Sequence, residues 1–82
     1  MAKIDYIKII NDYREALRAL YGSEIADKSD IYPSSGWIYI NLARRFHDGS
    51  IGIVEPADDG KRASQVIEMT QNLLKRAKEK QQ

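Results

Sequence analysis

Hydrophobic and polar side chains alternate along the run from Trp37 to Phe46, which is the pattern of a β-strand. One face of this predicted strand is apolar and carries Ile38, Ile40, Leu42 and Phe46. The other face carries Trp37, Tyr39, Asn41, Ala43 and Arg45, a set rich in residue types that are enriched at macromolecular interfaces. We therefore expect this second face to be covered, either by the rest of the protein or by a partner.

Two amphipathic helices are predicted on either side of the strand region. In the first, from Asp5 to Tyr21, the apolar stripe is formed by Tyr6, Ile9, Ile10, Tyr13, Ala16, Leu17, Leu20 and Tyr21. Gly22 supplies its C-terminal stop, and Ile4 and Ile7 fall on the polar side. The second helix spans roughly 61–80, with Asp58 or Asp59 as its N-cap. Its stripe is formed by Ala63, Val66, Ile67, Thr70, Leu73, Leu74 and Ala77.

A β-hairpin is indicated by the Asp48-Gly49 pair, which separates the long strand from a second one that begins at Ile51. A two-residue turn, or a four-residue loop of the same parity, places Phe46 opposite Ile51 and keeps Ile53 on the apolar face. A three-residue loop would set Ile51 and Ile53 beside Arg45 and Ala43, which splits the apolar set. We therefore expect the first register.

The segment from Ser23 to Gly36 is rich in turn-forming residues and is predicted as a loop, with a short extra strand near residues 30–33. The sequence thus predicts one α+β domain over residues 1–82, in the order helix, loop, antiparallel hairpin, helix. The expected core consists of Ile10, Tyr13, Leu17, Leu20, Ile38, Ile40, Leu42, Phe46, Ile51, Ile53, Val66, Ile67, Leu73 and Leu74.

Composition narrows the classes of function. The chain has 82 residues, a net charge of +1 and no cysteine, which excludes disulfides and thiolate chemistry. The residues after Met1 lack the apolar core of a signal peptide, and no run approaches membrane-spanning length, so a cytoplasmic location is expected. A chain of this size often gains stability by forming oligomers.

Enzymatic activity is not expected. His47, the only histidine, lies beside Asp48 in the predicted turn, and no spacing of residues matches a metal site or a nucleophile motif. The stretch 58–64 superficially resembles a phosphate cradle, but it lacks the spaced glycines, and helix capping explains it better. We expect no cofactor and no small-molecule substrate.

The function predicted from the sequence is that of a small protein-interaction module, which could act as a regulator, an adaptor or an inhibitor. Its predicted partner-binding residues are Trp37, Tyr39, Asn41, Arg45 and Gly52, and its expected partner is another protein or a second copy in a homodimer. The alternative is a nucleic-acid-binding protein in which Trp37 and Tyr39 stack on bases. The cations for that role would be Arg44, Arg45, Lys61 and Arg62.

Overall fold

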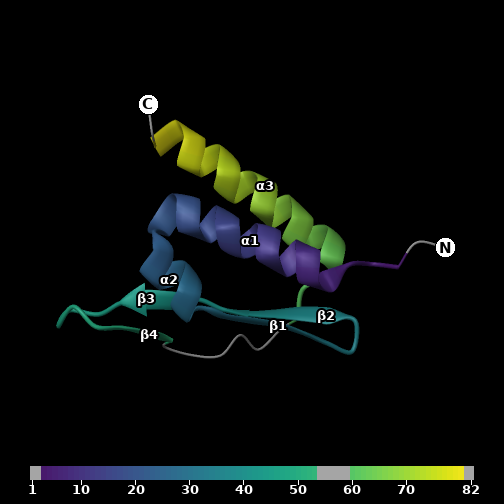
Figure 1. The fold of residues 1–82 in the computed structure, drawn as a ribbon, viewed down its shortest axis with the longest axis horizontal. Coiled ribbons are helices and arrows are strands. Elements are labelled where there is room, and N and C mark those ends of the chain that lie inside the picture. Colours follow the sequence, from purple (N-terminus) through teal and green to yellow (C-terminus); the bar gives the residue numbers. More distant parts are fainter. Residues whose placement is uncertain (1–2, 54–59, 81–82) are drawn as a thin grey trace.

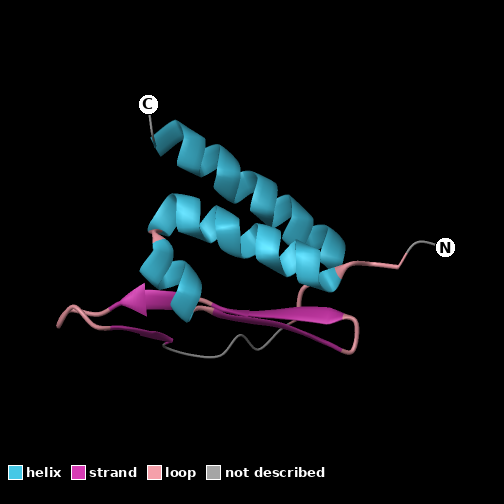
Figure 2. Ribbon diagram, in the orientation of Figure 1, coloured by secondary structure: helices cyan, strands magenta, loops and turns pink. Residues whose placement is uncertain are grey.

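A computed structural model describes residues 3–53 and 60–80 of the chain. The described part has an α+β fold, as expected, with helices on one side of two short antiparallel sheets (Figure 1, Figure 2). Its elements are α1 (Tyr6–Tyr21), α2 (Ser23–Lys28), β1 (Asp30–Ser34), β2 (Trp37–Asn41), β3 (Ala43–Arg45), β4 (Ile51–Ile53) and α3 (Ala63–Lys80).

The bounds of helix α1 agree closely with those predicted from periodicity. Asp5 caps it, because its carboxylate accepts a hydrogen bond from the Lys8 N–H at 3.0 Å. Gly22 ends it with a φ of 99°, and its N–H donates to the Arg18 carbonyl at 3.0 Å. Ile7 lies on the polar side and is 72% exposed, which agrees with its misfit to the apolar stripe.

The segment predicted as a loop contains two regular elements. The short strand expected near residues 30–33 is confirmed as β1, but α2 was not predicted. This six-residue helix is too short to show a helical period in the sequence, and it is stabilised by hydrogen bonds from Arg14 of α1. The Arg14 guanidinium donates to the carbonyls of Ala26 and, at 2.9 Å, Ser29, which are at the C-terminal end of α2.

The first sheet pairs β1 with β2, so that Ile31 lies opposite Ile40 and Tyr32 opposite Tyr39. The other edge of β2 is bridged by Lys61, through two backbone hydrogen bonds of 2.8 Å with Ile38. This bridge connects the start of the α3 region to β2.

The prediction of one continuous strand from Trp37 to Phe46 is wrong. The strand is interrupted at Leu42, and β3 turns to pair with β4 while β2 pairs with β1. Ala43 is buried, and its N–H donates to Ser29 Oγ at 3.0 Å, at the end of α2. Because α2 packs against β3 and β4, the buried side of the chain changes between β2 and β3.

The predicted hairpin register is also wrong. Arg45 lies opposite Ile51 and Ala43 opposite Ile53, as the three-residue loop requires. The loop is closed by the Phe46 N–H, which donates to the Ser50 carbonyl at 2.8 Å, and Gly49 adopts a φ of 90°. The apolar set is split because β2 buries one side in the core formed with α1 and α3, while β3 buries the other side against α2.

The core lies between α1 and its two neighbours, the sheet and α3 (Figure 1). Helices α1 and α3 run parallel, and Lys80 Nζ at the end of α3 lies 3.5 Å from the Leu20 carbonyl at the end of α1. The largest fully buried side chains are Leu17, Ile38 and Val66, one from each of these three elements.

Several residues predicted in the core are instead exposed, namely Leu42, Phe46, Ile53, Ile67 and Leu74, while Ile51 is half-buried. On α3 the buried positions are Val66, Thr70, Leu73 and Ala77, a narrow seam with the spacing of a two-helix contact. The predicted N-cap residues Asp58 and Asp59 lie outside the described residues. At the start of α3, the Arg62 N–H donates to Gln65 Oε1 at 2.9 Å.

Leu73 and Leu74 form a matched pair that tests this arrangement. We expect Leu73→Ala to lower the free energy of unfolding by about 2–5 kcal/mol, because Leu73 is 8% exposed and its removal leaves a cavity. Leu74→Ala should cost less than about 1 kcal/mol, because Leu74 is 49% exposed. Urea unfolding monitored by circular dichroism measures both values, and equal losses would contradict the narrow seam.

The hairpin loop predicts a pH effect. Hydrogen bonds from the Ser50 hydroxyl (2.6 Å) and the Ser50 N–H (2.9 Å) hold the pKa of Asp48 below its usual value. The ionised carboxylate therefore stabilises the loop above the unfolded-state pKa, and this contribution is lost as the pH falls through the folded-state pKa. In an NMR titration, Ser50→Ala should raise the Asp48 midpoint, while Ser64→Ala should leave it unchanged. An unmoved midpoint in Ser50→Ala would contradict the loop geometry.

Candidate functional site

The side of the first sheet that faces away from α1 carries a group of aromatic rings. Directly opposite residues of an antiparallel pair point to the same side, so Tyr32 lies with Tyr39 and Ser34 with Trp37. The rings of Tyr32 and Tyr39 are stacked, with centroids 5.4 Å apart and planes at 22°. We call the surface formed by Tyr32, Trp37, Tyr39 and Arg62 the aromatic face.

Trp37 is held by residues that precede α3. The Arg62 guanidinium carbon lies 4.7 Å from the centroid of the Trp37 ring, in a cation–π contact. Gly60 packs so closely that a Cβ there would lie 2.6 Å from the Trp37 Cβ. Both contacts follow from the backbone bridge between Ile38 and Lys61, which brings the neighbouring residues alongside Trp37.

The aromatic face is partly open to solvent. Trp37 is 37% exposed and Tyr32 43% exposed, while Tyr39 is half-buried. All the described helices lie on the opposite side of the strands (Figure 1). The expected intramolecular cover is therefore partial: Arg62 and Gly60 pack against Trp37, and no described helix covers the rest.

The structure does not gather the five predicted partner-binding residues on one surface. Trp37 and Tyr39 lie together, but Asn41 on the same strand is buried. Arg45 belongs to the second sheet, where it lies 3.7 Å from a carboxylate oxygen of Glu24 and donates to the Gly49 carbonyl at 3.1 Å.

Gly52 also belongs to the second sheet, opposite Arg44. A Cβ at Gly52 would lie 3.1 Å from Cε2 of the Phe46 ring, so the space beside this glycine is filled by the protein itself. Gly52 therefore does not share a surface with Trp37 and Tyr39, with which it was predicted to bind a partner.

Two residues of the aromatic face were not predicted in this role. Tyr32 reaches it because Ser35 and Gly36, with φ values of 52° and 82°, form a tight turn between β1 and β2. The Ser-Gly pair before Trp37 was an available signal for that turn. Arg62 reaches Trp37 because the neighbouring residues Lys61 and Ile38 pair with each other. These two residues are 23 positions apart in the sequence, and no local pattern predicts their pairing.

The cations proposed for nucleic acid do not line up with the aromatic rings. Arg44 and Arg45 lie on β3, in the other sheet. Lys61 is directly opposite Ile38 and so lies on the helix-facing side of β2. Of the four predicted cations, Arg62 alone contacts an aromatic residue of this face within the described part of the chain.

The structure brings no metal site together in the residues that it describes. His47 and Asp48 are exposed in the hairpin loop, and no cluster of three or more His, Asp or Glu side chains could hold a metal ion there. Across residues 3–53 and 60–80, none of the helices combines the length and the apolar character that crossing a bilayer requires.

Comparisons with protein-family models, with curated proteins and with solved structures find no match for this chain.

The contact between Gly60 and Trp37 can be tested with the single tryptophan as a probe. Gly60→Ala should displace the Trp37 side chain, shift its fluorescence emission and lower the free energy of unfolding by about 1–3 kcal/mol. Gly49→Ala is the matched control, because its Cβ would meet no atom within 4 Å and only its positive φ is strained. It should leave the emission unchanged. An unshifted emission in Gly60→Ala would contradict the packing.

Proposed function

We propose that this protein is a protein-interaction module that docks its aromatic face against a partner protein, and that the partner is a second copy of the chain. The observation that supports this is the gathering of Tyr32, Trp37 and Tyr39 on the side of the first sheet that no described helix covers. Tryptophan, tyrosine and arginine are the residues most enriched among interface hot spots. Their mutual contacts fix the rings in advance, which reduces the entropy lost on binding.

Self-association is supported by how much apolar surface the chain leaves open. Among the described residues, ten large apolar side chains are at least 37% exposed, in a protein of 82 residues. Two of these ten, Tyr32 and Trp37, lie on the same side of the first sheet, and contiguous exposed apolar groups, unlike singly scattered ones, are typical of interaction surfaces. A two-fold pairing would place the same face of each copy against the other.

Pairing through the aromatic face is favoured over pairing through the edge of β1. Both backbone polar groups of Ile38 point to Lys61, so the opposite residue, Pro33, directs its nitrogen to the outer edge of β1. Proline has no N–H to donate, and proline on an edge strand hinders the addition of another strand.

Nucleic-acid binding is less well supported by this geometry. Arg62 covers one surface of the Trp37 ring, and Tyr32 and Tyr39 stack on each other, which leaves less ring surface for bases. The net charge of +1 also provides little general attraction to phosphate.

Sedimentation equilibrium at high micromolar concentration tests the proposal. We expect a dimer for the unmodified chain, and a dissociation constant at least about tenfold higher for the Tyr32→Ser, Trp37→Ser variant, because it removes two predicted hot-spot rings. The control variant Ile7→Ser, Leu74→Ser removes exposed apolar side chains from the helices and should dimerise like the unmodified chain.

Circular dichroism verifies that each variant is folded. A monomer mass for the unmodified chain would overturn self-association, and an equal loss in both variants would overturn the role of the aromatic face. In parallel, labelled single- and double-stranded oligonucleotides are titrated at low salt. Tight binding that weakens steeply with salt would favour the nucleic-acid alternative, because phosphate contacts release counterions.

A further inference from the structure

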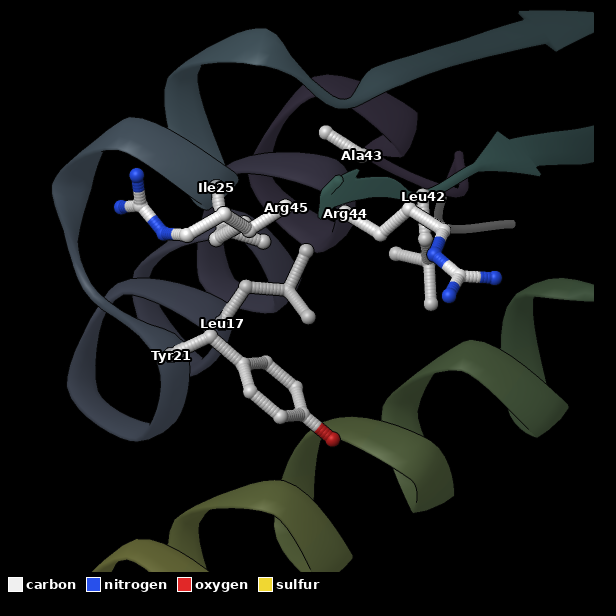
Figure 3. A pocket seen from close by; sticks show the side chains of 7 residues that line it. All are labelled: Leu17, Tyr21, Ile25, Leu42, Ala43, Arg44 and Arg45. Atoms are coloured by element: carbon white, nitrogen blue, oxygen red, sulfur yellow. The ribbon is translucent and has the colours of Figure 1, made fainter. Parts of the chain in front are cut away.

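A second open surface lies between the helices and β3. Two hollows, of about 350 and 260 Å³, share Leu17, Tyr21 and Leu42 in their linings and so form one groove. Ile25 of α2 lines the first hollow, and Met69 and Leu73 of α3 line the second. Figure 3 shows Leu17, Tyr21 and Leu42 around the first hollow, with the Tyr21 ring extending toward α3. We call this surface the arginine groove, because Arg44, Arg45 and Arg76 line it.

The charged residues that line the groove all carry the same sign. They are Arg44 and Arg45 in the first hollow and Arg76 in the second, and no carboxylate lines either hollow among residues 3–53 and 60–80. The Arg44 and Arg45 side chains leave β3 in opposite directions (Figure 3).

These arginines differ in their partners. Arg45 is paired with Glu24, at 3.7 Å. Arg44 and Arg76 form no ion pair within the described residues. Two guanidinium groups are therefore available for an external anion, one at each hollow.

The groove also exposes large apolar side chains. Tyr21 is 46% exposed and Leu42 45% exposed, although both adjoin the fully buried Leu17. Leu42 is open because it occupies the interruption between β2 and β3. The surface thus combines an apolar floor with unpaired positive charge at two places along it.

We propose that the arginine groove binds a short acidic peptide segment of another protein, with a large apolar side chain on the floor and aspartate or glutamate on both sides. The apolar side chain would contact Tyr21 and Leu42, and the carboxylates would pair with Arg44 and Arg76. Cations at both hollows match several carboxylates along a chain better than the single carboxylate of a fatty acid. The groove is on the helix side of the strands, so this proposal goes beyond the dimer of the aromatic face.

The probe is a pool of eight-residue peptides with a central Leu, Phe or Trp between Asp and Glu residues. Binding is followed by the amide chemical shifts of the ¹⁵N-labelled protein. We expect shifts around Tyr21, Leu42 and Leu73 with this pool, and none with pools that carry Lys in place of the acids or Ser in place of the apolar residue. Absence of these shifts at millimolar peptide would overturn the proposal.

A charge-reversed variant tests the two free arginines. Arg44→Glu, Arg76→Glu should weaken binding of the acidic pool at least about tenfold. The matched control, Lys75→Glu, Lys78→Glu, makes the same change in net charge on other sides of α3 and should change affinity by less than about threefold, because exposed distant charges are screened. Equal losses in the two variants would reduce the effect to net charge and overturn the role of the groove.

Two further measurements separate other occupants. Decanoate that binds as tightly as the acidic pool would make the groove a site for single-carboxylate amphiphiles, and shifts of groove residues that depend on protein concentration alone would make the occupant a second copy. Either result overturns the peptide proposal. The Tyr32→Ser, Trp37→Ser variant should bind the acidic pool normally, so failure of the dimer and failure of the groove can be distinguished.

Discussion

The hydrogen bond from the Ala43 N–H to Ser29 Oγ joins β3 to the end of α2, and the arrangement of the two sheets depends on this connection. Ser29 lies at the end of α2, where its hydroxyl also donates to the Ile25 carbonyl at 2.7 Å, and both Ser29 and Ala43 are buried. Ile38 of β2 lies in the core formed with α1 and α3, whereas β3 is held against α2, so one continuous strand cannot bury the same side at both places. The interruption at Leu42 resolves this conflict, and it separates the two sheets.

Periodicity predicted the parts of the fold that bury one continuous stripe. Helix α1 satisfies this condition, and so does β2 at Ile38 and Ile40, because each buries one stripe of side chains in the same core. The predicted register failed for the same reason: it assumed that Leu42, Phe46 and Ile53 share one buried side. The chain changes sides at Leu42 because of α2, an element too short to show a period of its own.

The candidate site was predictable only where its residues lie on one strand. Trp37 and Tyr39 are two positions apart on β2, and alternation places them on the same side without further information. Tyr32 and Arg62 join them through pairings with β1 and Lys61, which depend on turn geometry and on distant chain segments. Arg45 was wrongly predicted in the site, because the prediction assumed that the alternation of sides continues past Leu42. No local sequence pattern marks the interruption of the strand there.

The same break explains why the two candidate surfaces point in different directions. On β2, Trp37 and Tyr39 point to the side away from the buried Ile38 and Ile40, and they contribute to the aromatic face, away from the helices. At the end of β2 the chain leaves Leu42 open toward Tyr21, on the helix side. An occupant of the arginine groove therefore would not cover Trp37, and a protein docked on Trp37 would not cover the groove. The two proposed binding surfaces therefore do not overlap, and an acidic segment in the groove would not compete with pairing through the aromatic face.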